Sequence, residues 1–202
     1  MKNKKRKSDK LAAFIIIILL ILLAAWLSYF FIGLYDDYLI ECEKQNYPKY
    51  YTDSVEKYSA EYNIPEYIVY AVIKTESDFV RTAESSAGAV GLMQIMPSTF
   101  DWVMFRLGTE GDYDDLYESD VNIMCGCYLL SFLYEDLGYS WDNAFAAYNA
   151  GRGRVQEWLA DESISQNGVL VNIPSDGVKQ YIEKINRIAE KYFELYYSEN
   201  EE

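Results

Sequence analysis

Histidine is absent from the 202 residues of this chain, so its chemistry must rest on carboxylates, hydroxyls, amides or thiols. This composition excludes a Ser-His-Asp triad, a Cys-His pair and a histidine-ligated metal site. Glu76 is the strongest candidate for a catalytic group. It follows Val72 by four residues and Ile73 by three in the segment that begins at Pro65, so it lies on the apolar stripe of a predicted helix.

Burial of the Glu76 carboxyl group is expected to raise its pKa, because desolvation disfavours the charged form. The last turn of a helix also disfavours negative charge, which acts in the same direction. A carboxylic acid that stays protonated near neutral pH in an apolar cleft is suited to protonate the leaving oxygen of a glycosidic bond. The alternative, from the helix alone, is a glutamate whose side chain extends to solvent at the helix end.

Two longer runs of residues follow the Glu76-Ser77 pair. They are Gly88-Ala89-Val90-Gly91-Leu92-Met93-Gln94-Ile95-Met96-Pro97 and Ala146-Ala147-Tyr148-Asn149-Ala150-Gly151, with Asn122, Gly126 and Tyr128-Leu129 between them. In this order and spacing the chain resembles the soluble lytic transglycosylase family, whose lysozyme-like members cleave bacterial peptidoglycan. The resemblance covers roughly residues 58–192 and implies a mainly α fold of the α+β lysozyme-like class.

The resemblance implies that Glu76 is the catalytic acid and base. It also implies a set of residues that contact the saccharide, which are Ser85, Gln94, Met96, Tyr148, Asn149 and Tyr181. Gln94 is the one polar side chain in its apolar run, so if it is buried it needs a hydrogen-bonding partner, for which a sugar acetamido group would serve. The alternatives are an internally bonded amide for Gln94 and simple core packing for Tyr148.

One stretch departs from the family pattern. Many members carry Pro-x-x-x-Glu-Thr-Arg-x-Tyr-Val near their end, where this chain has Pro174-Ser175-Asp176-Gly177-Val178-Lys179-Gln180-Tyr181-Ile182. Tyr181 is kept and Lys179 stands in place of the arginine, but Gly177 and Val178 replace the glutamate and the threonine. The departure affects the expected geometry of the sugar subsites there and leaves the identity of the catalytic acid unchanged.

A single essential carboxylate favours a reaction in which the substrate itself takes part. Glycosidases normally use two carboxylates, and Asp78 is expected on another face than Glu76. The resemblance implies that the acetamido group of muramic acid assists and that its C6 hydroxyl replaces water, which leaves a 1,6-anhydro-MurNAc end. No metal and no cofactor is implied. Two alternatives stay open: a muramidase that uses water, and a catalytically silent protein that binds peptidoglycan.

The elements that position these residues are predicted to be mainly helical. Helices are expected over residues 65–79, 99–107 with Ser98 as its N-cap, 120–136, 142–149, 154–159 and 176–197, and a small hairpin or loop over 169–173. Together they form one catalytic domain over 58–197. Cys42, Cys125 and Cys127 are an odd number, so they cannot all pair within the chain, and the last two are expected as small buried side chains.

The amino-terminal region has the pattern of a membrane anchor. Residues 1–10 carry six cations and one anion, and the 24 residues of 11–34 carry no charge. As a helix this span is about 36 Å long, enough to cross a hydrocarbon core of about 30 Å. We therefore predict a basic cytoplasmic segment (1–10), a transmembrane helix (11–34), a juxtamembrane stalk (35–57), an extracytoplasmic catalytic domain and an acidic tail (198–202). A cleaved signal peptide is the alternative.

The overall charge restricts the partners that the chain can bind. Its formal net charge is −14, which argues against nucleic acid as a partner because a polyanion would be repelled. Tyrosine is common, with 20 residues, so glycan binding through aromatic stacking and hydrogen bonds is expected in place of charge attraction. The expected partners are peptidoglycan glycan strands and, through one span, the cell membrane.

Overall fold

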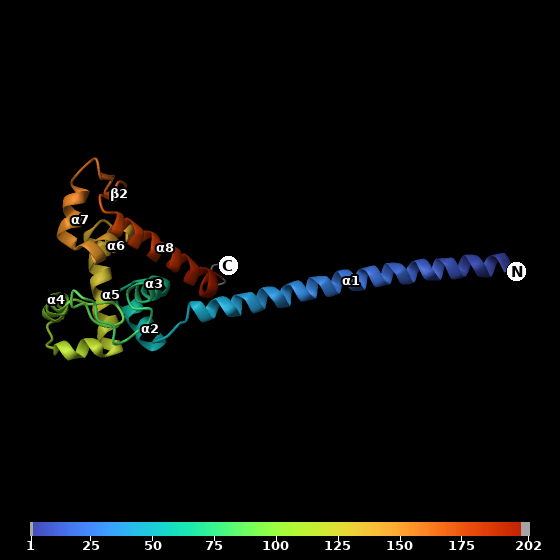
Figure 1. Cartoon of the computed structure of the whole chain (residues 1–202), viewed down its shortest axis with the longest axis horizontal. Coiled ribbons are helices and arrows are strands. Elements are labelled where there is room, and N and C mark those ends of the chain that lie inside the picture. Colours follow the sequence, from blue (N-terminus) through green and yellow to red (C-terminus); the bar gives the residue numbers. More distant parts are fainter. Residues whose placement is uncertain (1, 199–202) are drawn as a thin grey trace. The chain divides into compact units, whose positions relative to one another are not determined.

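The computed structural model describes residues 2–198, with side chains from Phe14 onward. Two compact units make up the chain, Met1–Pro48 and Lys49–Glu202 (Figure 1). Of the predicted basic segment 1–10, residues 2–10 are described by their backbone alone. The predicted acidic tail 198–202 lies outside the described residues except for Ser198.

The first unit consists mainly of the helix α1, Lys2–Asn46 (Figure 1). Its part from Phe14 to Asn46 contains an apolar stretch long enough to cross a membrane, a property that a signal sequence near the N-terminus would share. The helix continues without a break through the first half of the predicted stalk, because no proline precedes Pro48 and the sequence offers no other strong helix stop there.

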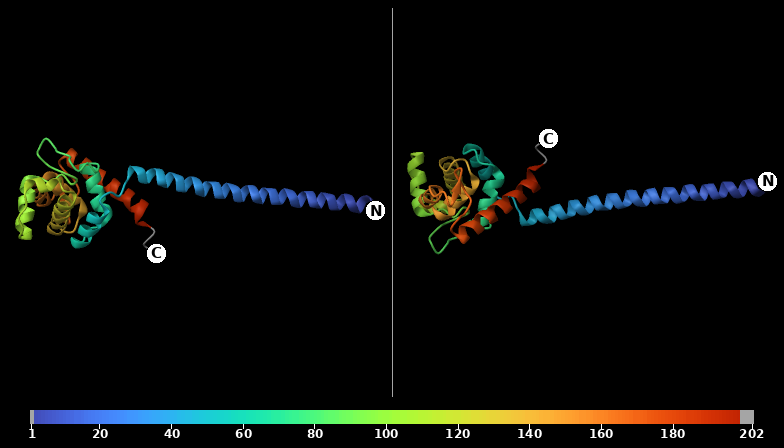
Figure 2. Two further views of the ribbon diagram at one scale, coloured as in Figure 1. Left: turned by 90° about the horizontal axis from the view of Figure 1, so that it is seen from below. Right: turned by 90° about the horizontal axis from the view of Figure 1, so that it is seen from above.

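The second unit is mainly helical, which confirms the predicted fold class (Figures 1 and 2). Its elements are α2 (Thr52–Glu61), α3 (Glu66–Glu76), α4 (Pro97–Leu107), the 3-10 helix η1 (Tyr113–Tyr117), α5 (Ser119–Asp136), α6 (Trp141–Ala150), α7 (Arg152–Leu159), β1 (Ser165–Gln166), β2 (Val169–Leu170) and α8 (Asp176–Tyr196).

Helix α5 is the central helix of this unit and packs against both α2 and α6. Buried residues occur around much of its circumference and include Asn122, Ile123, Cys125, Gly126, Cys127, Leu130 and Leu133. A helix that is apolar on most sides belongs in the interior of a domain. Cys125 and Cys127 are buried free thiols, which confirms the prediction that they act as small core side chains.

Helix α8 lies along α3, and this is the most extensive helix pair in the unit. Its buried side chains repeat every three or four residues and are Val178, Ile182, Ile185, Ile188, Ala189 and Tyr192. This stripe packs on the continuous buried run of α3, Ile68 to Ile73. The pairing brings residues near the start of α8 next to the end of α3, where Glu76 lies.

Three predicted boundaries were wrong. Helix α3 ends at Glu76 and not at residue 79, because Asp78 and Phe79 adopt left-handed backbone angles with φ of 47° and 65°. Helix α4 begins at Pro97, whose fixed φ suits the first helical position, so Met96 and not Ser98 is the N-cap. Finally, α2 begins within the predicted stalk 35–57 and its Val55 is fully buried, so the compact unit begins at Lys49 and not at residue 58.

The hairpin lies slightly earlier than the predicted 169–173 and joins β1 to β2. Its register pairs Ser165 with Leu170 and Gln166 with Val169, across a turn made by Asn167-Gly168 with φ of 53° and 78°. Positive φ at both turn positions is what a tight two-residue hairpin requires.

The buried side chain of Asn143 on α6 holds this hairpin. Its Nδ2 donates to the carbonyl oxygens of Leu137 at 2.9 Å and Gly168 at 2.8 Å, and its Oδ1 accepts from the Leu170 amide at 3.2 Å.

Candidate active site

Glu76 is the last residue of α3 and its side chain is half-buried. The residues one turn earlier, Val72 and Ile73, are buried in the core, as the apolar stripe predicted. Tyr181 on α8 donates a hydrogen bond from its hydroxyl to Oε1 of Glu76. The carboxyl group lines a groove of about 570 Å³, together with Ser77 and Lys184 among others. The glutamate is therefore held in one orientation and still faces a space that a ligand can enter.

The pKa of Glu76 is raised above that of an ordinary glutamate, mainly because burial disfavours its charged form. The hydrogen bond from Tyr181 and the nearby positive charge of Lys184 act against this effect and lower the pKa. The predicted direction of the shift is thus confirmed. A carboxyl group whose pKa is raised holds its proton to higher pH than an ordinary glutamate, which suits a group that donates a proton to a substrate atom.

Lys184 belongs to the surroundings of Glu76, although the sequence analysis did not single it out. Its Nζ donates to the carbonyl oxygen of Thr75 at 3.0 Å, beside the end of α3. The signal that would have found it is spacing: Lys184 follows Tyr181 by three residues, so the two side chains share a face of α8.

Asp78 lies in the same groove as Glu76, which differs from the expectation that it faces elsewhere. The reason is that α3 ends at Glu76, so helical spacing no longer applies two residues later. The carboxylate of Asp78 is largely exposed and pairs with Lys74 Nζ at 2.8 Å. Asp78 therefore lies near the site with its charge already neutralised by a neighbour.

The loop that follows α3 is joined to it by Ser77. The hydroxyl of Ser77 donates to the carbonyl oxygen of Leu92 at 2.8 Å. Within the loop, Val90 forms isolated bridges with both Glu84 and Ile95. In the Glu76-Ser77 pair, Glu76 therefore supplies the carboxyl group, and Ser77 fixes the glycine-rich loop beside it.

Asn122 on α5 is the main internal support of this loop. It is almost completely buried, and its Nδ2 donates to the carbonyl oxygens of Val90 at 2.9 Å and Leu116 at 2.8 Å. Its Oδ1 accepts from the amide of Met93 at 2.8 Å. One side chain therefore pairs with three backbone groups; the Met93 amide and the Leu116 carbonyl depend on it, while the Val90 carbonyl also accepts from the Ile95 amide at 2.9 Å.

Two glycines of the motif are required by this close packing. Gly91 has a φ of 80°, and a Cβ atom there would lie 2.2 Å from Nδ2 of Asn122. A Cβ atom at Gly126 would lie 2.2 Å from the sulfur of Met93. Both positions bring the loop and α5 closer together than a side chain would allow.

Gln94 and Ser85 make contacts within the loop. Gln94 has a left-handed backbone with φ of 49°, and its Nε2 donates to the carbonyl oxygens of Ala83 at 3.1 Å and Gly91 at 3.0 Å. Of the two interpretations of Gln94, the internally bonded amide is therefore the one that applies to its Nε2. Ser85 is exposed, and its hydroxyl oxygen accepts from the Ala89 amide at 3.0 Å.

Met96, Tyr148 and Asn149 line a second groove, of about 450 Å³. The hydroxyl of Tyr148 donates to the carbonyl oxygen of Met93 at 2.7 Å, which ties α6 to the loop. The pKa of Tyr148 is raised well above its ordinary value, first by burial and then by the negative charge of Glu76. The same two causes lead the rise in the pKa of Tyr181. Glu76, Tyr148 and Tyr181 thus share one electrostatic neighbourhood.

Trp102, Phe132 and Arg152, which the sequence analysis did not assign, also line this second groove, and Arg106 lies beside them. The rings of Trp102 on α4 and Phe132 on α5 meet edge to face, with centroids 4.8 Å apart. The guanidinium groups of Arg106 and Arg152 each lie over the Phe132 ring, at 5.5 Å and 5.6 Å from its centroid. An aromatic surface with polar groups at its edge is suited to bind a sugar ring.

The stretch that departs from the family pattern forms the start of α8. Ser175 is the N-cap and accepts from the Val178 amide at 3.4 Å, while Val178 itself is buried. At this position the substitution has placed an apolar side chain in the core. Three residues later in the same helix, Tyr181 keeps its contact with Glu76.

Comparison with protein families identifies the domain. The family model described as "Transglycosylase SLT domain" matches residues 53–168. The soluble lytic murein transglycosylase of Escherichia coli K12 is 30% identical over 146 residues, which are 70% of this chain and 23% of that protein. Membrane-bound lytic murein transglycosylase C of Actinobacillus pleuropneumoniae serotype 5b is 29% identical over 168 residues, covering 72% of this chain and 46% of that protein. The chain thus spans less than half the length of these relatives.

Solved structures give the same result. An inactive mutant of the lytic transglycosylase Slt from Pseudomonas aeruginosa, in which a glutamate is replaced by glutamine, matches with a TM-score of 0.68 and 28% identity, covering 75% of this chain and 25% of that one. The complex of the 70-kDa soluble lytic transglycosylase with bulgecin A matches with a TM-score of 0.67 and 29% identity, covering 74% of this chain and 25% of that one. The compact unit therefore has a lysozyme-like fold, and the chain belongs to the SLT transglycosylase domain family.

Proposed function

We propose that this protein is a peptidoglycan lytic transglycosylase, with Glu76 as its catalytic acid and base. The observation that carries the proposal is the state of Glu76: a half-buried carboxyl group with a raised pKa, oriented by Tyr181 and facing a groove. Relatives named as lytic murein transglycosylases support the reaction class. So does the glutamate-to-glutamine substitution in the solved Pseudomonas aeruginosa structure, which is named as inactive.

The proposed reaction uses one carboxyl group twice. Protonated Glu76 donates its proton to the oxygen that links C1 of MurNAc to the next GlcNAc, and the C1–O bond breaks. The acetamido group of the same MurNAc stabilises the positive charge that develops at C1. The Glu76 carboxylate then accepts the proton of the C6 hydroxyl while O6 bonds to C1. The products are a 1,6-anhydro-MurNAc end and a free GlcNAc hydroxyl group, and Glu76 is protonated again.

The remaining site residues are proposed to hold the glycan. Met96, Tyr148 and Asn149 line the aromatic groove, so they are placed to contact sugar rings and acetamido groups. Ser85 is exposed on the loop and is free to turn toward a ligand, whereas Gln94 acts mainly by shaping the loop backbone. Tyr181 acts through Glu76, which it orients.

Membrane anchoring is the second part of the proposal. The uncharged stretch 11–34 of α1 and the basic residues before this stretch support a single span with a cytoplasmic N-terminus, with the catalytic unit outside the membrane. Protease added to intact cells should then digest the catalytic unit. A catalytic unit that is protected until the membrane is opened would contradict this topology.

The activity is tested with Glu76→Gln, assayed as the full chain in detergent on purified peptidoglycan. The amide keeps the shape of the side chain but cannot donate and recover a proton, so we expect a loss of about 10²–10⁴-fold in rate. Glu135→Gln is the matched control, because Glu135 is exposed on α5 and lies in neither groove. A folded Glu76→Gln protein that keeps most of its rate would disprove the assignment.

Mass spectrometry of the products separates the remaining mechanisms. Anhydro ends support the transglycosylase reaction. Ordinary reducing ends would identify a muramidase that uses water, and an absence of any cleavage by the wild-type chain would leave a glycan-binding protein.

A further inference from the structure

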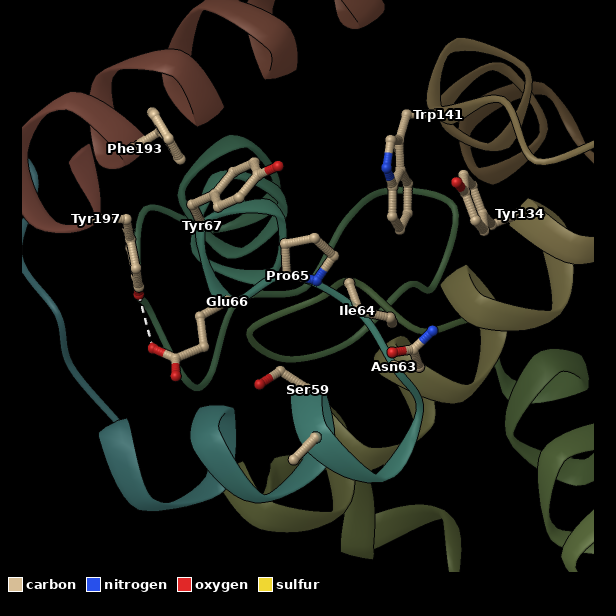
Figure 3. A pocket seen from close by; sticks show the side chains of 11 residues that line it. Ser59, Asn63, Ile64, Pro65, Glu66, Tyr67, Tyr134, Trp141, Phe193 and Tyr197 are labelled. Carbon is tan, nitrogen blue, oxygen red and sulfur yellow. Dashed lines mark hydrogen bonds between the residues drawn. The ribbon is translucent and has the colours of Figure 1, made fainter. Parts of the chain in front are cut away.

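A groove of about 700 Å³ lies at the opposite end of α3 from Glu76 (Figure 3). Its lining comes from α2, α3, α5, α6 and α8 and comprises Ser59, Ala60, Asn63, Ile64, Pro65, Glu66, Tyr67, Tyr134, Trp141, Phe193 and Tyr197. Glu66 and Glu76 are ten residues apart on one helix, a separation of about 15 Å. A ligand in this groove would therefore not occupy the place of the bond that Glu76 is proposed to cleave.

Aromatic side chains form two walls of the groove, on either side of Pro65 (Figure 3). On one side Tyr134 and Trp141 are stacked, with ring centroids 4.2 Å apart. On the other side the ring of Tyr67 meets Phe193 edge to face, with centroids 5.4 Å apart. Because these rings already support one another, a ligand would not have to order them on binding. Rigid aromatic faces are suited to pack against the apolar face of a sugar ring.

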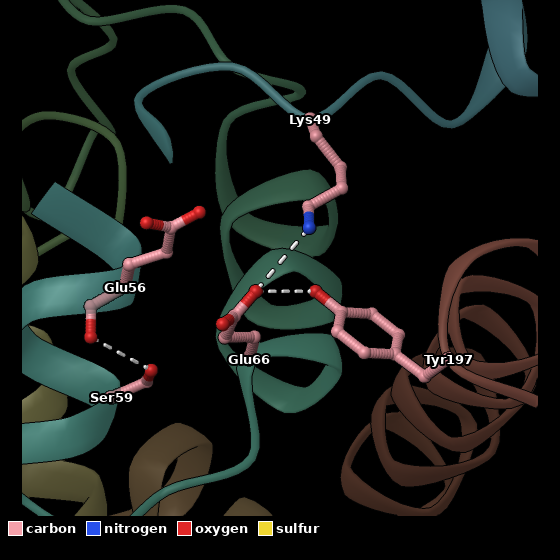
Figure 4. A network of polar contacts seen from close by, with 5 residues as sticks. All are labelled: Lys49, Glu56, Ser59, Glu66 and Tyr197. Carbon is pink, nitrogen blue, oxygen red and sulfur yellow. Dashed lines mark hydrogen bonds and ion pairs between the residues drawn. The ribbon is translucent and has the colours of Figure 1, made fainter. Parts of the chain in front are cut away.

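Polar groups lie among these rings and are held in fixed positions (Figure 4). Oε2 of Glu66 accepts hydrogen bonds from Tyr197 at 2.7 Å and from Lys49 Nζ at 3.3 Å. Both contacts use Oε2, so we assign Oε1 as the acceptor for a ligand hydroxyl. The buried Ser59 and the exposed amide of Asn63 add further hydrogen-bonding groups to the lining.

The charge of the lining favours a neutral ligand. Among the described residues that line the groove, Glu66 is the one carboxylate, and it forms an ion pair with the ammonium group of Lys49. Lys49 is itself held between the rings of Tyr70, Tyr196 and Tyr197, at 5.4, 5.7 and 4.8 Å from their centroids. The described lining of the groove therefore presents neither an unpaired carboxylate for a cationic peptide nor an unpaired cation for an acidic one. Aromatic faces with a few fixed hydrogen-bonding groups match a polyhydroxylated, uncharged ligand.

We propose that this groove is a second glycan-binding site, which holds a stretch of the peptidoglycan sugar chain while Glu76 acts on another bond. The proposal rests on the proposed function for the identity of the polymer. It predicts that the groove contributes to binding of the intact wall and contributes little to turnover of fragments that fill only the catalytic grooves.

The binding test uses Ala60→Trp. Ala60 is exposed on α2 and lines the groove, so an indole ring there fills the space without removing a packed aromatic residue. Ala160→Trp is the matched control, because Ala160 is also exposed but lies outside the grooves described above. Each substitution is made in the full chain carrying Glu76→Gln, in detergent, and sedimentation with purified peptidoglycan is measured. We expect Ala60→Trp to weaken binding about tenfold, or about 1.4 kcal/mol, and Ala160→Trp to leave it unchanged.

Competition identifies the occupant. Peptide-free glycan fragments should displace the chain from the wall in the control and have less effect in Ala60→Trp. If free stem peptide, and not glycan, displaces the chain from the wall in the control and has less effect in Ala60→Trp, the proposal is overturned. Equal binding of Ala60→Trp and Ala160→Trp to peptidoglycan would also overturn it. Near-ultraviolet circular dichroism establishes that each variant keeps its tertiary structure.

A turnover test separates this proposal from the proposed function. With Glu76 intact, the rate on whole peptidoglycan is divided by the rate on a soluble tetrasaccharide fragment. This ratio should fall several-fold in Ala60→Trp and stay constant in Ala160→Trp, and an unchanged ratio would count against the second site. If the wild-type chain cleaves neither substrate, the proposed reaction fails, while the sedimentation and competition measurements still decide whether the groove binds glycan.

Discussion

Replacing Asn122 with alanine removes the internal support of the loop beside Glu76. The substitution deletes two donated hydrogen bonds, to the carbonyl oxygens of Val90 and Leu116, and one accepted from the amide of Met93. Because Asn122 is almost completely buried, water has little access to replace these bonds. The carbonyl of Met93 is also the acceptor for Tyr148, so a shift of this residue moves the contact between the loop and α6.

The expected loss of stability follows from the number of groups left without partners. The Met93 amide and the Leu116 carbonyl are left without a partner, at about 1–3 kcal/mol each. The Val90 carbonyl keeps its hydrogen bond from the Ile95 amide, so its loss is about 1 kcal/mol, and relaxation of the loop makes these costs less than additive. We therefore expect a loss of about 3–5 kcal/mol, which is a large share of the about 5–15 kcal/mol that stabilises a typical domain. For a domain of this size the melting temperature should fall by about 6–20 °C.

Asn143 provides the matched control. It is equally buried, and its side chain also makes three hydrogen bonds with backbone groups, but two of these hold the β1–β2 hairpin and one the end of α5, and none reaches the loop. Melting of the full chain in detergent is followed by near-ultraviolet circular dichroism, and activity is measured at a temperature where every variant is folded. Both alanine variants should lose similar stability. Asn122→Ala should lose about tenfold or more in rate because the site is displaced, and Asn143→Ala should keep its rate.

Two results would refute this reasoning. If Asn122→Ala melts within a degree or two of the wild type, the buried bonds do not carry the stability assigned to them. If the two variants lose the same activity, the effect reflects general destabilisation, and the loop does not position the site.

Three other predictions concern Glu76 and the core. Asp78→Asn should retain most of the activity, because Asp78 is not a second catalytic carboxylate; loss of about 10²-fold or more would favour a two-carboxylate hydrolase. Activity should fall as pH rises through the raised pKa of Glu76. Lys184→Met should move this fall in the pH–rate profile to higher pH, because the Lys184 ammonium group favours the charged carboxylate and lowers its pKa. A fall at the same pH in wild type and variant would contradict this. Tyr70→Phe should stabilise the domain by about 1 kcal/mol in thermal melts, because the buried Tyr70 hydroxyl has no partner among the described residues; a lower melting temperature would indicate a hidden partner.

The local features of the site were predictable where spacing along a single element decides them. Glu76 follows the apolar positions of α3 at helical intervals, so its half-buried setting and the direction of its pKa shift could be derived from the residues alone. The central position of α5, including its buried thiols, likewise follows from an apolar composition that leaves no polar face.

The supports of the site were not predictable in the same way, because they join residues that are distant in the chain. Asn122 reaches backbone groups 29 and 32 residues away, and nothing in its own neighbourhood indicates those partners. The end of α3 depended on left-handed backbone angles at two consecutive residues, Asp78 and Phe79, and a bulky residue such as Phe79 rarely adopts them. The groove at the start of α3 is built from four further helices, and its aromatic residues look individually like ordinary core positions.

The hydrogen bond between Glu76 and Tyr181 joins residues that are 105 positions apart, so the two are synthesised at different times. At a synthesis rate of about 5–20 residues per second, the glutamate leaves the peptidyl-transferase centre about 5–20 seconds before its tyrosine exists. Until α8 is complete and packs on α3, the apolar run of α3 lacks its most extensive packing partner. Glu76 likewise lacks the hydrogen bond from Tyr181 that orients it. A nascent or truncated chain therefore carries Glu76, the proposed catalytic acid, in an unassembled site. Docking of α8 on α3 is the step that completes the proposed site.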